Sequence, residues 1–198
     1  MTPEPGGALQ EIIAASEAVA RGGEGAAIAS TRVRGWMKSG DIDALGALYH
    51  LLMAGQRRPK IEPPLEFDEY HRFLMAYYER CIREDPKSKW ADSRYSAGWD
   101  LVNWLASVWK ERRTQAFSEW KRWLEHLYRS GDSEVRECLV NATLEHLFEN
   151  RKLAKEFSGW KDDPLLGDAY RAALEWSARG GESPLGSGER PSKRNESS

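Results

Sequence analysis

The sequence predicts an all-α fold, a compact bundle of seven to nine helices that is partly solenoid-like in its C-terminal half. Apolar residues recur at helical spacing along most of the chain, and no stretch alternates β-branched with polar residues as a half-buried strand would. The connections between the expected helices are mostly two to five residues long. Short connections between amphipathic helices favour antiparallel neighbours, so a bundle is expected.

The N-terminal part of the chain predicts three helices. The first covers residues 8–21 and ends at a pair of glycines, which suit the C-terminus of a helix. The second covers about 25–38. The third starts at Asp41, a good N-cap residue, and ends near Gly55. Residues 56–66 contain three prolines and are expected to form a loop.

The middle of the chain predicts two long helices. The first covers about 67–84, and four of its residues form one apolar stripe: Tyr70, Leu74, Tyr77 and Cys81. Asp85 and Pro86 form a helix-start signal, because the carboxylate caps and the proline needs no donor in the first turn. We therefore expect the next helix to run from Pro86 to about Arg113, with a possible break at 96–98.

The C-terminal part predicts helices over about 115–129, 133–149, 151–160 and 164–178, the last after a second Asp-Pro signal. Residues 127–136 (LYRSGDSEVR) resemble the turn of a HEAT-type repeat, in which an acidic residue caps the second helix and Val-Arg opens its inner face. No strict period of 30–45 residues continues along the chain, so a helical bundle is preferred to a repeat array.

One domain over residues 8–179 is expected. Residues 1–7 are rich in Pro and Gly and predict a flexible N-terminus, and residues 180–198 have too few apolar side chains to offset the entropy of ordering. No apolar run is long enough to cross a membrane and no secretory signal is readable, so a cytoplasmic protein is expected. Cys81 and Cys138 lack metal-ligand spacing and are predicted to be reduced core thiols.

Tryptophan is the unusual component, with nine copies, of which six fall between residues 90 and 123. The helix around Trp99 is apolar on most sides, which predicts a central position and a core rich in tryptophan. The alternative interpretation is that some of the indoles line a groove or form an exposed anchor patch. Trp36 is expected to be the most peripheral, because Arg32, Arg34 and Lys38 flank it.

The candidate binding site depends on two polar residues in this apolar helix, Asp100 and Asn103, which share one face. A buried carboxylate needs a partner, and Asp92, Arg94 and Tyr95, one to two turns before Asp100, could supply one. The pattern predicts a pocket for a ligand or a partner's basic group, although an internal network or a solvated face would leave the same pattern. The predicted binding residues are Asp92, Arg94, Tyr95, Asp100, Asn103 and Trp104.

Catalytic residues, metal ligands and cofactors are not predicted. His126 and His146 each follow a glutamate, but adjacent residues point about 100° apart on a helix and do not converge on a metal. No Gly-rich phosphate loop and no nucleophile motif is present. An enzyme is therefore less expected than a binding protein.

Charge is unevenly distributed, although the net charge is only −2. Residues 31–60 carry six basic and two acidic residues, whereas residues 132–149 carry five acidic residues and one basic residue. The acidic block suits a basic partner through charge matching, and the basic stretch suits phosphate. A uniformly basic nucleic-acid binder is excluded.

Four segments carry a resemblance to a known kind of protein: YERC at 78–81, WADSRY at 90–95, WDLV at 99–102 and LVNATLEHLF at 139–148. They resemble a family of uncharacterised bacterial all-helical proteins. Their sequence pattern is also similar to that of the compact immunity proteins that are encoded beside secreted toxins. The resemblance implies a cytosolic protein that binds and blocks a toxin.

Three hypotheses for the function follow. The first is a non-enzymatic protein-binding module, with the immunity-type inhibitor as one form of it. The second is a small-ligand-binding protein or an enzyme that uses the polar pocket around Asp100. The third, which the composition favours least, is a nucleic-acid-associated regulator that acts through residues 32–58. The sequence does not indicate an oligomeric state.

Overall fold

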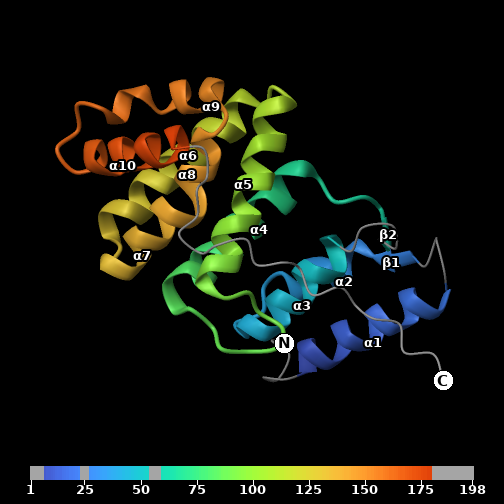
Figure 1. Ribbon diagram of the computed structural model, residues 1–198. Coiled ribbons are helices and arrows are strands. Elements are labelled where there is room, and N and C mark those ends of the chain that lie inside the picture. The colour runs from blue at the N-terminus through green and yellow to red at the C-terminus, as the bar shows by residue number, and fades with distance from the viewer. Residues whose placement is uncertain (1–6, 23–26, 54–58, 180–198) are drawn as a thin grey trace, which may run out of the picture.

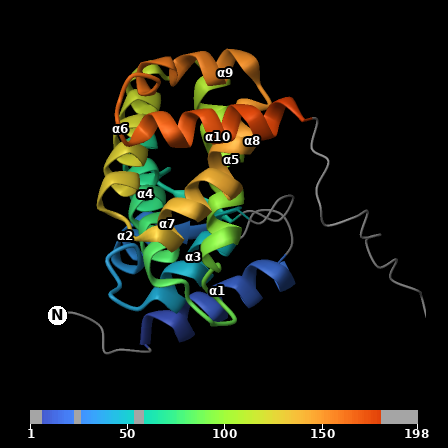
Figure 2. The ribbon, with the colours of Figure 1, turned by 60° about the vertical axis from the view of Figure 1, so that its left-hand side comes forward.

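Two long helices, α4 (Phe67–Glu84) and α5 (Arg94–Lys110), run through the middle of the molecule and hold its two ends together. The structure is a computed structural model, and it describes residues 7–22, 27–53 and 59–179. Figures 1 and 2 show the N-terminal helices, in blue, at one end and the C-terminal helices, in orange and red, at the other. The predicted all-α fold is confirmed.

The N-terminal end consists of three helices and a small sheet. Helices α1 (Gly7–Gly22) and α3 (Ile42–Met53) pack against each other, and α3 also packs against α4. The short helix α2 (Ser30–Trp36) follows directly on a strand. Gly7 lies in α1. The rest of the predicted flexible N-terminus and the predicted tail at 180–198 lie outside the described residues.

The structure corrects the prediction that no strands form. Residues Ala27–Ala29 form β1, where a helix was expected, and Lys60–Glu62 form β2 within the expected loop. The two strands are parallel, with Ile28 opposite Ile61. Strands of three residues are too short to show a period of two, and their partners lie far apart in the chain, so local sequence does not reveal them.

The connection between α4 and α5 is also different from the prediction. Asp85 ends α4 in a left-handed conformation (φ 46°), and α5 begins only at Arg94. The helix expected from Pro86 is therefore wrong for residues 86–93, and no break occurs at 96–98. Asp85 does cap a helix, but across the loop: its Oδ1 accepts a hydrogen bond of 3.0 Å from the Arg94 N–H.

The C-terminal end follows the prediction closely. Helix α6 (Thr114–Ser130) is followed by one continuous helical run, which comprises α7 (Ser133–Cys138), a π-helical segment (Leu139–Leu144) and α8 (Glu145–Phe148). As expected, Asp132 caps α7 by accepting a hydrogen bond of 2.9 Å from the Val135 N–H. In the π segment the Glu145 N–H donates to the carbonyl of Val140, five residues back.

Two shorter elements and a final helix close this end. Helix α9 (Arg151–Glu156) and a 3₁₀ turn (Ser158–Trp160) replace the single helix predicted over 151–160. Helix α10 (Leu166–Ala178) packs on α8 and on the π segment. With residues 133–148 counted as one helix, the described ranges contain nine helices. None of these helices combines the length and apolar character needed to cross a bilayer.

Aromatic side chains form much of the core. Trp120 is fully buried, and its Nε1–H donates a hydrogen bond of 3.1 Å to Nδ1 of the buried His71. Trp36 is also buried, and Glu11 of α1 accepts a hydrogen bond from its indole N–H, so the expectation that it is the most peripheral tryptophan is wrong. Trp99 instead is half exposed, so α5 is not enclosed on all sides.

Both cysteines are buried free thiols, as predicted. Burial raises the pKa of Cys81 and of Cys138 to about 12, so both stay protonated at neutral pH. Cys138 donates a sulfhydryl hydrogen bond to the Arg94 carbonyl (3.3 Å). These thiols belong to the packing of the core.

Two glycines allow close approach between elements. A Cβ atom at Gly98 of α5 would lie 2.9 Å from the Cβ of Ala142 in the π segment, which explains a glycine inside this helix. A Cβ at Gly46 of α3 would lie 2.3 Å from the carbonyl oxygen of Trp90. The loop before α5 therefore rests directly on the backbone of α3.

Gly46→Ala is expected to destabilise the protein by about 1–3 kcal/mol, because the added methyl group would push the backbone of α3 away from the backbone at Trp90. Gly35→Ala is the matched control, since a Cβ at that helical position meets nothing within 4 Å. It should stabilise the protein by about 0.5–1 kcal/mol, because alanine favours helix over glycine. Urea unfolding followed by circular dichroism measures both. A destabilisation equal in the two variants would contradict the close approach.

The stability of the protein should fall as the pH is lowered through about 6.5. Burial lowers the pKa of His71 in the folded state, so the unfolded state binds the proton more readily and acid favours unfolding. His71→Asn keeps an acceptor for the Trp120 indole but does not titrate in this range. The variant should show a shallower slope of unfolding free energy against pH between about 7.5 and 5.5. An unchanged slope would exclude His71 as the source.

Candidate functional site

Helix α5 and the loop before it carry all six residues of the predicted binding site, but they point in different directions. Successive residues of an α-helix are rotated by about 100° around its axis, so sequence neighbours face different elements. Two of the six meet in a partly buried network. One of these two, Asp100, also lines a groove together with Asn103 and Trp104. Of the other two residues, one makes a separate internal contact and one lies on the outer surface. The six residues are Asp92, Arg94, Tyr95, Asp100, Asn103 and Trp104.

The network joins Asp92 and Asp100 through tyrosines of α3 and α4. The Tyr49 hydroxyl donates a hydrogen bond of 2.7 Å to Asp100 Oδ2, and the Tyr77 hydroxyl donates one of 2.8 Å to Asp92 Oδ2. The two tyrosine rings stack with their centroids 5.0 Å apart. Tyr78 donates in turn to the Tyr49 hydroxyl (3.1 Å). Both carboxylates thus obtain their hydrogen-bond donors from other helices, and the donor to Asp100 is not one of the residues in the preceding turns that were expected to supply it.

Burial controls the electrostatics of this network. It raises the pKa of Asp92, and the nearby negative charge of Asp100 raises it further, whereas the Tyr77 hydrogen bond and His50 act in the opposite direction. His50 Nε2 lies 3.5 Å from Asp92 Oδ1. Burial and the hydrogen bond to Asp100 raise the pKa of Tyr49 far above its usual value. The phenols therefore remain donors at neutral pH and hold both carboxylates in place.

A groove of about 670 Å³ lies beside this network, between α5 on one side and α3, β2 and α4 on the other. Asp100, Asn103, Ser107 and Glu111 repeat at three- and four-residue intervals and present polar groups along one side of α5. The opposite wall is aromatic and aliphatic. Its side chains are Leu52, Met53, Ile61, Leu65, Phe67 and Tyr70.

Asp100 supplies the uncompensated negative charge of the groove. Glu111 is neutralised there, because it accepts hydrogen bonds from Arg113 Nε (2.8 Å) and from the Ser107 hydroxyl (3.0 Å). Asp100, by contrast, forms no ion pair with any residue that the structure describes. Trp104 adds an indole N–H that is buried without a hydrogen-bond partner in the described residues. The groove can therefore take a cation on an apolar stem.

The outer face of α5 carries two large exposed aromatic side chains, Tyr95 and Trp99, one helical turn apart. Their exposed fractions are 44% and 51%, the largest for big apolar residues among the described residues. The Trp99 ring stacks on His146 of α8 (centroids 3.9 Å apart), and His146 in turn meets the edge of Trp176 from α10. Asn103 follows Trp99 by one more turn, is exposed, and leads into the groove.

Part of the predicted acidic block lies exposed on the helical run that packs beside α5. Glu134, Glu137 and Glu149 are exposed, and the charge of Glu137 contributes to a raised pKa at Tyr95, after burial. Glu145 is buried, and burial raises its pKa, so it does not belong to the acidic surface. The acidic surface is smaller than the sequence indicates, but it borders the exposed aromatic residues.

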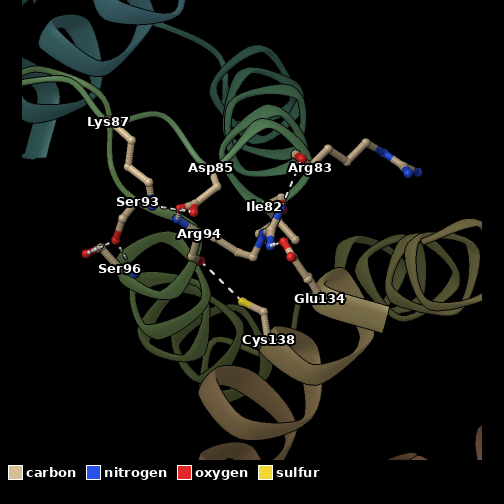
Figure 3. Close-up of polar contacts among 9 residues, drawn as sticks. All are labelled: Ile82, Arg83, Asp85, Lys87, Ser93, Arg94, Ser96, Glu134 and Cys138. Carbon is tan, nitrogen blue, oxygen red and sulfur yellow. Dashed lines mark hydrogen bonds and ion pairs between the residues drawn. The ribbon is translucent and has the colours of Figure 1, made fainter. Parts of the chain in front are cut away.

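Arg94 makes a separate internal contact (Figure 3). Its guanidinium group donates to the carbonyl oxygens of Ile82 (2.6 Å) and Arg83 (3.3 Å), which lie in the last turn of α4, and it pairs with Glu134 of α7. A cation at a helix C-terminus satisfies carbonyls that have no partner within the helix. Arg94 is buried and therefore joins three helices instead of facing a ligand.

Sequence reasoning missed Tyr49, Tyr77 and His50 as partners of the two carboxylates, because only folding brings them to α5. It also assigned Trp99 to the core. One signal does indicate the exposure of Trp99: Tyr95 and Asn103 lie four residues before and after it and share its side of the helix. Because Asn103 is polar and lies near Asp100 on the helix, the side of α5 that carries Tyr95, Trp99 and Asn103 is not expected to be fully enclosed.

The described residues contain no group of three or more His, Cys, Asp or Glu side chains that could hold a metal ion. The chain matches no family model, no curated protein and no solved structure.

Arg94→Met is expected to destabilise the protein by about 3 kcal/mol, because two carbonyls at the end of α4 lose their donor inside the protein. Glu134→Gln removes only the charge of a partner whose side chain is 73% exposed, and should cost less than about 1 kcal/mol. Chemical denaturation of the two variants gives the comparison. Equal losses would show that the ion pair, and not the carbonyl contacts, carries the stabilisation.

Proposed function

We propose that this protein is a non-enzymatic protein-binding module that docks a partner along the exposed side of α5. The observation that carries the proposal is the continuity of this side. Tyr95, Trp99 and Asn103 follow one another at intervals of one turn, and the groove that contains Asp100 opens next to them. Exposed aromatic side chains thus lie beside a groove that contains a carboxylate. This arrangement is typical of the hot spot of a protein interface.

Trp99 is suited to be the anchor. Half of its surface is exposed, although indoles contribute more than most side chains to binding energy when buried at an interface. Its ring is already held against His146, which Trp176 contacts from behind. A side chain fixed before binding loses little conformational entropy on complex formation, and this favours affinity.

The groove is suited to a lysine or arginine side chain of the partner. The aliphatic stem of such a side chain would lie against the apolar wall, and its charged end would reach Asp100, which lacks a basic partner in the described residues. Tyr70 and Trp104 present ring surfaces to the same space, and aromatic faces attract cations.

The acidic border adds charge complementarity. Glu137 and Glu149 are exposed near the aromatic pair, so a basic partner would approach faster and in a defined orientation. An immunity-type inhibitor of a toxin, acting in the cytoplasm as the sequence resemblance implies, is the specific form of this function that we propose.

A second candidate function uses the Asp92–Asp100 network. A small-ligand-binding protein or an enzyme would use His50 and the raised pKa of Asp92 for proton exchange beside the groove. Nucleic-acid regulation through residues 32–58 has less support, because Arg34 forms two hydrogen bonds with Glu69 and Arg32 lies 3.6 Å from Glu11. Arg57 and Arg58 lie outside the described residues.

The test is affinity capture from the source cells, identification of the captured protein, and calorimetry with that purified partner. Trp99→Ala should weaken binding about tenfold or more, whereas Trp99→Phe should weaken it less. Asp100→Asn should weaken binding and reduce its dependence on salt. Asp162→Asn, an exposed carboxylate between the 3₁₀ turn and α10 that does not line the groove, is the matched control and should bind as the unmodified protein does.

The outcomes separate the candidates. Unchanged affinity in both Trp99→Ala and Asp100→Asn would refute docking along α5. Turnover of a substrate that is lost in Asp100→Asn or in His50→Gln, without a captured protein, would establish the second candidate instead.

A further inference from the structure

A second cavity lies at the C-terminal end of α5, at the turn into α6. We propose that it binds a small phosphate ester that carries an aromatic ring, such as a nucleoside monophosphate. The cavity measures about 540 Å³, the size of a small-molecule site. Its walls are formed by the C-terminus of α5, by the first turns of α6, and by one side of α9.

Arg112 in this turn has a backbone conformation that favours glycine. Its φ angle is 57°, and the turn is a Schellman motif: the Arg112 N–H donates to the Trp109 carbonyl (3.0 Å) and the Arg113 N–H to the Val108 carbonyl (3.1 Å). Arginine at this position is less favourable than glycine for the backbone alone. A non-glycine residue in this unfavourable conformation points to a function for its side chain.

Asp85 provides the comparison, since it is the other non-glycine residue with positive φ among the described residues. Its carboxylate caps α5 through the Arg94 N–H and pairs with Lys87, so its side chain has an internal role. The Arg112 guanidinium forms no hydrogen bond or ion pair within the described part of the chain, and it lines the cavity. Its guanidinium group is therefore available to a ligand in the cavity.

The cavity carries excess positive charge. Lys110, Arg112 and Lys152 line it without forming an ion pair with any described residue, and Glu156 is the single carboxylate of the lining. Arg113 also lines it but is neutralised by Glu111. Two positive charges remain, which match the charge of a phosphate monoester near neutral pH. Arginine is well suited to phosphate because its planar fork donates two parallel hydrogen bonds.

The apolar part of the cavity lining is the reason for proposing an aromatic ring in the ligand. Trp109 and Phe117 both face the cavity, and Phe117 is fixed by an edge contact with Phe157 (centroids 6.1 Å apart). Flat aromatic side chains stack on nucleobases without regard to base identity. A ligand with a phosphate on one side and a ring on the other would satisfy both parts of this cavity.

The test is calorimetric titration with adenosine monophosphate, inorganic phosphate and adenosine at low salt. The monophosphate should bind at least tenfold more tightly than either of the others. Arg112→Gly should lose at least tenfold in affinity while its melting temperature stays the same or rises, because glycine suits the backbone. This pair of readouts separates loss of the site from loss of the fold.

Three further variants sharpen the result. Glu156→Gln should tighten binding, because it removes the carboxylate from the lining. Arg72→Gln is the matched control, since Arg72 lines a neighbouring cavity that shares Arg112 but not Trp109. Trp99→Ala should bind the nucleotide normally, which keeps this site independent of partner docking.

The proposal is overturned if the unmodified protein shows no saturable binding of adenosine monophosphate, or if Arg112→Gly binds it equally well. Equal affinity for adenosine monophosphate and inorganic phosphate would refute the aromatic ligand. Loss of binding in Arg72→Gln but not in Arg112→Gly would place the site in the neighbouring cavity and refute this one.

Discussion

The buried guanidinium group of Arg94 is the contact on which the arrangement of the helices depends. It satisfies the last carbonyls of α4, starts α5 and reaches α7 through Glu134, so one side chain sets the positions of three helices. A cation inside a protein is stable only where polar partners surround it, which leaves few alternative arrangements of these helices. The capping bond from Asp85 to the Arg94 N–H fixes the same point from the backbone.

Once α5 is fixed in this way, each of its remaining sides meets a different neighbouring helix, and these neighbours give the sides different polar and aromatic groups. Towards α3 and α4 it meets the hydroxyl groups of tyrosines, and the Tyr49 hydroxyl holds the Asp100 carboxylate in one orientation. Towards α8 it meets His146, which supports an indole that is otherwise in contact with solvent. Its C-terminal turn presents basic side chains. The surfaces that we interpret as functional are thus properties of one rigid helix and not of loops, and rigid elements position binding groups more accurately.

Local sequence was sufficient for most of the helices and for few of the contacts. The stripe that includes Leu74 and Tyr77 located α4 over its full length, because burial of that stripe against the core is what makes the helix stable. The burial of Trp36 and the exposure of Trp99 were not predictable, since Glu11 and His146 determine them and both lie on other elements. For the same reason the sequence predicts Asp100 as a candidate site residue but does not predict its donor Tyr49.

The π-helical segment Leu139–Leu144 changes the direction in which the following side chains of its helix point. A turn that closes on the fifth residue holds one residue more than an α-helical turn, so every side chain after it is rotated by roughly 100° relative to an uninterrupted α-helix. That rotation brings His146 beneath Trp99. The one additional residue in this turn therefore decides which side chain lies against the exposed indole of Trp99.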